Sequence, residues 1–239
     1  MPASSAHLDE PAGAPSQSAS GLEMLLVRHR VVAVVRAPEI PDAAALCEAL
    51  LAGGIGLVEL TFTTPDLARH IRTASAFAAS VPGHDLVVGV GTVTRVDQAR
   101  AAIDAGAGFL VTPGLGAFAA GVVEAAHDAE VPVLLGAFTP SEVLAATELG
   151  ADAVKVFPAS VGGTRLVSDL RGPFPDVAFV PSGGVTGANA RAFLDAGAVA
   201  VSAGSGVVSP AAVTSGDWRG ITSAARDFRA RLESAAESR

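Results

Sequence analysis

The sequence predicts an α/β fold, a single-domain (β/α)8 (TIM) barrel, from two observations. Eight short apolar runs follow one another along the 239 residues, and Ala-rich amphipathic stretches separate them. Near-continuous apolar strands that alternate with amphipathic helices indicate a parallel sheet covered by helices, and eight such units match the size of a barrel. An open doubly wound sheet is the structural alternative. It would carry a G-x-G-x-x-G turn after the first strand, where this chain has RAPEIPDA.

The predicted strands are the eight apolar runs, which are rich in β-branched residues. They are residues 31–36, 57–62, 86–91, 108–113, 132–138, 153–158, 177–184 and 198–206. The stretches between them, such as DAAALCEALLAGG and VDQARAAIDAGA, repeat apolar residues at helical spacing. Residues 20–30 precede the first strand and predict an extra N-terminal helix that plugs the bottom of the barrel.

The ends of several helices are also marked. Four helical stretches end in AGG, AGA, LGA and AGA, and a glycine just past a helix end takes the left-handed conformation that closes the last turn. At Thr64-Pro65 and Thr139-Pro140 a hydroxyl precedes a proline, which is typical of a capped helix start.

Two regions are predicted, a flexible tail over residues 1–20 and the barrel domain over residues 21–239. The tail is small, polar and Pro-rich, and it lacks the basic start and apolar core of a signal peptide. The apolar runs elsewhere are too short to span a membrane. Cys47 is the single cysteine, so no internal disulfide is possible. We therefore expect a soluble cytoplasmic protein.

The charge balance disfavours polyanionic partners. The formal net charge is −8, whereas nucleic acid and anionic membranes call for clustered Lys and Arg. Neither is expected as a partner. No Cys or His spacing typical of a metal site occurs, and we expect all five histidines to lie at the surface. The sequence therefore predicts neither a metal nor another cofactor.

Lys155 is the only lysine in the chain, and it lies inside the apolar run AVKVFP. If it points into the filled interior of a barrel, an ionised amine there is costly without a partner. Desolvation favours the neutral amine, which is the form that attacks a carbonyl carbon to make a Schiff base. Glu59, the only acidic residue in the eight runs, is the candidate partner and proton carrier.

Two other interpretations of these residues remain open. The ammonium group of Lys155 could reach the surface along the strand. Glu59 could form a buried ion pair with Arg36 in the lower or middle part of the barrel.

Glycine clusters follow the seventh and eighth runs, in PSGGVTGANA and SAGSGVVSP. Barrels often build a phosphate site here, because glycines let backbone N–H groups approach the anion. The alternative is that these glycines only form tight turns.

Taken together, these motifs resemble the 2-keto-3-deoxy-6-phosphogluconate (KDPG) and 4-hydroxy-2-oxoglutarate (KHG) aldolases. The chain carries VVRA, VELTFTTP, GVGTV, VTPG, VKVFPA, PSGGV and GSGVV in family order, over about residues 22–233. The family is class I, in which a barrel lysine forms an imine with pyruvate without a metal, and its members are commonly trimers. The resemblance implies that Lys155 is the Schiff-base lysine and Glu59 the general acid and base.

The resemblance also implies binding residues. Arg36, Thr92 and Pro113 resemble the surroundings of the pyruvate carboxylate, and Phe157 resembles the aromatic wall beside the lysine. The phosphate cradle corresponds to Ser182, Gly183, Gly184, Gly204 and Ser205. Thr63 is a departure, because many members have an arginine there that helps to hold the substrate carboxylate. Arg36 is then left with more of that task.

The resemblance therefore implies a homotrimeric enzyme that cleaves KDPG to pyruvate and glyceraldehyde 3-phosphate, and acts further on 4-hydroxy-2-oxoglutarate. Two alternatives are other aldolases, for the phosphogalactonate epimer (KDPGal) or for unphosphorylated 2-keto-3-deoxy sugar acids. A phospho-sugar epimerase and a non-catalytic phosphate-ligand-binding barrel are two further alternatives, but neither needs both Lys155 and Glu59.

Overall fold

A computed structural model describes residues 21–81, 83 and 85–234. The predicted tail over residues 1–20 lies outside the described residues, as do His7 and His84. The strands are β1 (Val31–Val35), β2 (Leu57–Thr61), β3 (Val87–Gly91), β4 (Leu110–Val111), β5 (Val133–Ala137), β6 (Ala153–Val156), β7 (Phe179–Pro181) and β8 (Val201–Ala203). The helices are α1 (Gly21–His29), α2 (Ala43–Ala52), α3 (Leu67–Ser80), α4 (Val96–Asp104), α5 (Ala119–His127), α6 (Pro140–Glu148), α7 (Ala159–Arg171), α8 (Ala190–Asp195), α9 (Pro210–Ser215) and α10 (Trp218–Ser234).

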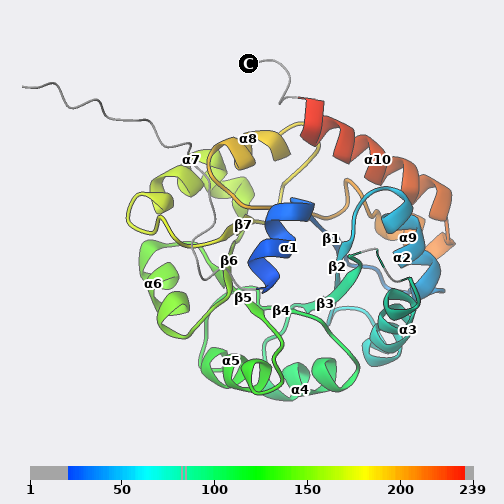
Figure 1. The fold of residues 1–239 in the computed structure, drawn as a ribbon, viewed down its shortest axis with the longest axis horizontal. Coiled ribbons are helices and arrows are strands. Elements are labelled where there is room, and N and C mark those ends of the chain that lie inside the picture. Colours follow the sequence, from blue (N-terminus) through cyan, green and yellow to red (C-terminus); the bar gives the residue numbers. More distant parts are fainter. Residues whose placement is uncertain (1–20, 82, 84, 235–239) are drawn as a thin grey trace, which may run out of the picture.

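The eight strands form one parallel sheet in the order β7-β6-β5-β4-β3-β2-β1-β8. The two end strands also meet: the Val199 N–H donates to the Phe179 carbonyl at 3.0 Å, and a parallel bridge joins Ser182 to Ser202. Figure 1 shows the helices as a ring around the strands. The predicted (β/α)8 barrel is thereby confirmed. Each strand is shorter than the apolar run that predicts it, and β4, β7 and β8 are much shorter.

Helix α1 closes one end of the barrel, as its sequence predicts. Leu22 and Leu26 are buried in one cluster with barrel residues that include Leu57, Phe109 and Leu134. Burying each leucine contributes about 1.5–3 kcal/mol to the stability of the fold. In Figure 1, α1 (dark blue) lies across the centre of the ring.

Strand periodicity then fixes which side chains enter the barrel. Successive residues of a strand point to opposite faces, so residues two apart share a face. Leu57 and Ala153 belong to the interior cluster that α1 covers. Glu59 and Lys155, two residues further along, therefore also point inward, nearer the C-terminal ends of their strands. Most other buried apolar residues form a second cluster between the strands and the helices.

The predicted helix ends are largely confirmed. The glycines after α2, α4, α6 and α8 all have positive φ, between 86° and 99° (Gly54, Gly106, Gly150 and Gly197). Thr139 and Glu142 form a capping box at the start of α6. The expected cap at Thr64 is wrong, because α3 begins at Leu67 and the buried Thr64 hydroxyl donates instead to the Ala37 carbonyl at 2.9 Å.

Along the part of the chain that the structure describes, none of the helices combines the length and the apolar character that crossing a bilayer requires.

Candidate active site

The centre of the candidate site is a buried pair of opposite charges at the C-terminal ends of the barrel strands. Lys155 Nζ lies 3.5 Å from Glu59 Oε1. The Lys155 side chain is 8% exposed and that of Glu59 is 2% exposed. Each group offsets part of the cost of burying the other. The structure excludes the interpretation in which the ammonium group of Lys155 reaches the surface. It also places Lys155, rather than Arg36, against the Glu59 carboxylate.

Phe157 follows β6 and lies beside the lysine. The centre of its ring is 5.8 Å from Lys155 Nζ, within the range of a cation–π contact. Phe157 is 40% exposed and is one of the exposed large apolar residues in the described part of the chain. Phe157 therefore lies beside the lysine, where the resemblance implies an aromatic wall.

Arg36 and Thr92 also come together at this end of the barrel. Arg36 follows β1 and Thr92 follows β3, and Arg36 Nη2 donates to Thr92 Oγ1 at 3.4 Å. Thr92 has a φ of 60°, a left-handed conformation that is unusual for a β-branched residue. Such conformations concentrate at functional sites, where the surrounding fold holds them in place.

Thr63 is exposed and forms a hydrogen bond with its neighbour on the same strand end. The hydroxyls of Thr61 and Thr63 are 2.8 Å apart, and Thr61 donates to the Val35 carbonyl at 3.1 Å. Because Thr61 has a single proton to donate, Thr63 is the donor between the two hydroxyls. The proton of the Thr63 hydroxyl is therefore already engaged within the protein.

Pro113 lies in a loop that a buried threonine holds in place. Thr112 is fully buried, and its hydroxyl donates to the Gly114 carbonyl at 2.9 Å and accepts from the Gly136 N–H at 3.0 Å. Gly136 is paired in register with Lys155. Thr112 is not among the site residues that the sequence predicts. The feature of the sequence that could have pointed to Thr112 is a hydroxyl side chain inside the apolar run GFLVTP.

The loop after β7 contains Ser182, Gly183 and Gly184. The two glycines have φ angles of 84° and 79°, a region that other residues rarely adopt. Ser182 and Gly183 accept hydrogen bonds from the backbone N–H groups of Ala159 and Ser160, at 2.7 and 2.9 Å. The loop is therefore held against the start of α7, directly after the strand that carries Lys155.

The loop after β8 contains Gly204 and Ser205, and the bridge between Ser182 and Ser202 brings the bases of the two loops together. The Gly204 carbonyl accepts the N–H groups of Val207 and Val208, both at 2.9 Å. Apart from Gly204 and its two chain neighbours, no heavy atom of the described residues lies within 4 Å of the place where a Cβ of Gly204 would be. A side chain there would enter open space.

Of the described histidines, His127 is exposed as expected, whereas His70 and His29 differ from the expectation. His70 is only 6% exposed, since it shares the buried stripe of α3 with Leu67, Ile71 and Ala74, and burial is the main cause that lowers its pKa. The Nε2 atom of His29 is also buried, and burial is the main cause that lowers the pKa of this ring. Among residues 21–81, 83 and 85–234, no three His, Cys, Asp or Glu side chains gather as metal ligands would.

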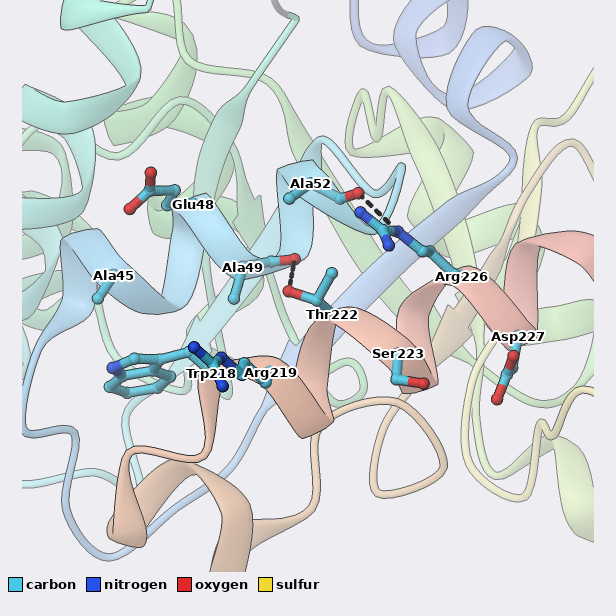
Figure 2. Close-up of a pocket in the computed structure, with 10 residues that line it drawn as sticks. All are labelled: Ala45, Glu48, Ala49, Ala52, Trp218, Arg219, Thr222, Ser223, Arg226 and Asp227. Carbon is cyan, nitrogen blue, oxygen red and sulfur yellow. Dashed lines mark hydrogen bonds between the residues drawn. The ribbon is translucent and has the colours of Figure 1, made fainter.

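A separate hollow of about 480 Å³ lies outside the barrel, between α2 and α10 (Figure 2). Thr222 Oγ1 and Arg226 Nε donate to the carbonyls of Ala49 and Ala52, at 2.9 and 3.2 Å, and hold the two helices together. Its lining residues come from these two helices alone. The hollow thus belongs to the helical layer and not to the site that contains Lys155.

The chain is similar in sequence and in fold to known proteins. The chain matches the family model for KDPG and KHG aldolase over residues 22–224. The KHG/KDPG aldolase of Escherichia coli (strain K12) is 34% identical over 206 residues, which are 86% of this chain and 93% of that protein.

Two solved structures are also similar. KDPG aldolase from Legionella pneumophila, with pyruvate captured at low pH as a covalent carbinolamine intermediate, has a TM-score of 0.77 and 28% identity, covering 87% of this chain and 98% of that one. A native KDPGal structure has a TM-score of 0.75 and 25% identity, covering 87% of this chain and 96% of that one.

Proposed function

Because the chain belongs to the KDPG and KHG aldolase family, we propose that it is a class I aldolase that cleaves KDPG to pyruvate and glyceraldehyde 3-phosphate. The observation that carries this proposal is the buried contact of 3.5 Å between Lys155 Nζ and Glu59 Oε1. It combines the nucleophile and the proton carrier that imine chemistry requires.

The first stage of the proposed reaction forms the imine. Lys155 first passes its ammonium proton to Glu59. The neutral amine then attacks the 2-keto carbon of the substrate and forms a carbinolamine. Glu59 gives a proton to the departing hydroxyl, directly or through one water molecule, and water leaves. The product is a protonated imine, and its positive nitrogen draws electrons from the neighbouring carbon atoms.

The second stage breaks the carbon chain. Glu59, now a carboxylate, accepts the proton of the C4 hydroxyl, and the electrons of the C3–C4 bond move toward the imine nitrogen. Glyceraldehyde 3-phosphate departs and an enamine of pyruvate remains. Protonation at C3 and addition of water then release pyruvate and restore the free amine.

We assign the binding roles from the placement of the remaining residues. Arg36, Thr92 and the Pro113 loop surround the pyruvate carboxylate, with Thr63 at the edge of this region. The loop with Ser182, Gly183 and Gly184 and the loop with Gly204 and Ser205 hold the phosphate. The positive φ angles of Gly183 and Gly184 and the open space at Gly204 support the phosphate assignment.

We further propose that the enzyme is metal-independent, because the protonated imine itself supplies the electron sink. A homotrimer in the cytoplasm is the assembly and location that the family resemblance favours. Sedimentation of the purified chain tests the trimer.

Pyruvate release tests the proposed function. Purified protein is mixed with KDPG, and pyruvate is followed through a coupled dehydrogenase, with and without EDTA. We expect pyruvate at the same rate in both. The KDPGal epimer, 4-hydroxy-2-oxoglutarate and unphosphorylated KDG are compared in the same assay. Absence of pyruvate from every substrate would overturn the proposal, and loss of activity in EDTA would overturn the metal independence.

A further inference from the structure

Strand β3 presents no side chain to the barrel interior at two successive inward positions. Gly89 is paired in register with Glu59, and Gly91 is paired with Thr61. Side chains from the two neighbouring strands fill the space above these glycines. The ring of Phe109 lies over Gly89, and the carboxyl end of Glu59 lies over Gly91.

Glu59 occupies the place that a side chain at position 91 would need. A Cβ on Gly91 would lie 2.8 Å from Glu59 Cγ and 2.5 Å from Cδ, and closer still to Oε1. Carbon atoms that are not bonded to each other approach to about 3.5 Å. Glu59 would therefore have to leave its present position, and with it the contact to Lys155 Nζ.

Space, rather than backbone conformation, is what calls for glycine here. Gly91 belongs to β3 and is not among the glycines with positive φ, so alanine can adopt the same backbone conformation. The three atoms nearest to the added Cβ all belong to one flexible side chain, that of Glu59. The fold can accept alanine at position 91 if Glu59 moves.

We propose that Gly91 is a positioning residue of the aldolase site, whose missing side chain provides the space from which the Glu59 carboxylate meets Lys155. Gly91 touches no substrate, and it acts only through Glu59. This inference rests on the proposed function and deepens it, because it names what sets the distance between the acid and the nucleophile.

The test is a double-mutant cycle with Gly91→Ala, Glu59→Ala and the double variant. The rate of adduct formation with pyruvate is measured by borohydride trapping, and kcat and KM by pyruvate release. We expect Gly91→Ala to lower the trapping rate and kcat at least about ten-fold with little change in KM, since positioned acid–base catalysis contributes about 10²–10⁴-fold.

The double variant shows whether the effect of Gly91→Ala acts through Glu59 or is independent of it. Glu59→Ala removes the atoms that collide with the methyl group added at position 91, so the double variant should match Glu59→Ala within about two-fold. If Gly91→Ala alone fails to fold and Glu59→Ala restores folding, the same collision is demonstrated. Wild-type rates in Gly91→Ala, or an equal loss in both backgrounds, would overturn the inference.

Gly89→Ala is the matched control on the same strand and face. The three atoms nearest to its Cβ would all belong to the Phe109 ring, so the ring is what alanine collides with first. We therefore expect Gly89→Ala to lower the free energy of unfolding. Its fractional effect on the trapping rate should be the same with Glu59 present and in the Glu59→Ala background. If the wild-type protein forms no adduct with pyruvate, the proposed function itself fails, and this result is distinct from a wild-type adduct that Gly91→Ala leaves unchanged.

Discussion

Lys155 Nζ and Glu59 Oε1 lie 3.5 Å apart in the barrel interior, although 96 positions separate the two residues in the chain. They come from β6 and β2, which are not neighbours in the sheet. Only a closed barrel brings the inward faces of two such strands together.

Replacing Glu59 by glutamine should remove proton transfer and keep the shape of the side chain. We expect kcat to fall by about 10²–10⁴-fold, while pyruvate is still trapped slowly on Lys155. Steady-state kinetics and borohydride trapping measure the two effects. A glutamine variant whose kcat is within two-fold of the wild-type value would show that Glu59 is not the proton carrier.

Replacing Gly204 by valine should fill the open space beside the proposed phosphate loops. Among the described residues, only its chain neighbours come within 4 Å of the new Cβ, so the fold should tolerate the change. We expect KM for KDPG to rise about ten-fold or more, and trapping of pyruvate, which has no phosphate, to stay at the wild-type rate. An unchanged KM would place the phosphate elsewhere.

Replacing Thr112 by valine should leave the buried Gly136 N–H without an acceptor and release the Gly114 carbonyl. An unsatisfied buried group costs about 1–3 kcal/mol, so the free energy of unfolding should fall by that amount. Denaturation in urea measures it. The matched control is Thr112→Ser, which keeps the hydroxyl and should retain most of the stability. Equal stability of the valine variant and the wild type would contradict the hydrogen bonds described.

The capping box of α6 makes stability depend on pH. The backbone N–H of Phe138 and the Thr139 hydroxyl hold the pKa of Glu142 below its ordinary value. Since the folded pKa is the lower one, the stabilisation is complete above the unfolded pKa of about 4.3 and is lost as pH falls through the folded value.

Glu142→Ala should therefore lower the free energy of unfolding by about 1 kcal/mol near pH 7. The difference from wild type should shrink as pH falls below about 4. Urea denaturation across this pH range measures it. Glu148→Ala, at the other end of α6, removes a charge without removing a cap and serves as the control. A constant difference at every pH would contradict this account.

Much of the fold follows from the sequence because strand and helix periods are local properties. The eight apolar runs each become a strand, and α1 covers the barrel end as its position predicts. The Thr64 cap was wrong because a buried hydroxyl bonds with a carbonyl from a distant loop, which no local pattern reveals. The surface position expected for His70 was wrong for the opposite reason, since its helical spacing with Leu67 and Ile71 already marked a buried face.

Some residues of the candidate site could likewise be predicted from the sequence, and others could not. Lys155 and Glu59 could be selected because each is a rare residue type in an apolar run. The roles of Thr112 and Gly91 could not be inferred in this way, because they depend on which atoms of the neighbouring strands and loops face these residues. A glycine in a strand has no side chain from which a role could be inferred until the structure shows what occupies its place.

The most direct test of the central claim uses the single lysine of the chain. The protein is incubated with pyruvate and borohydride, digested, and searched by mass spectrometry for a reduced adduct, with Lys155→Arg as the control. We predict an adduct on the peptide that contains Lys155 and none on that peptide in the arginine variant. No adduct on this peptide, or an adduct confined to the N-terminal amine, would contradict the account.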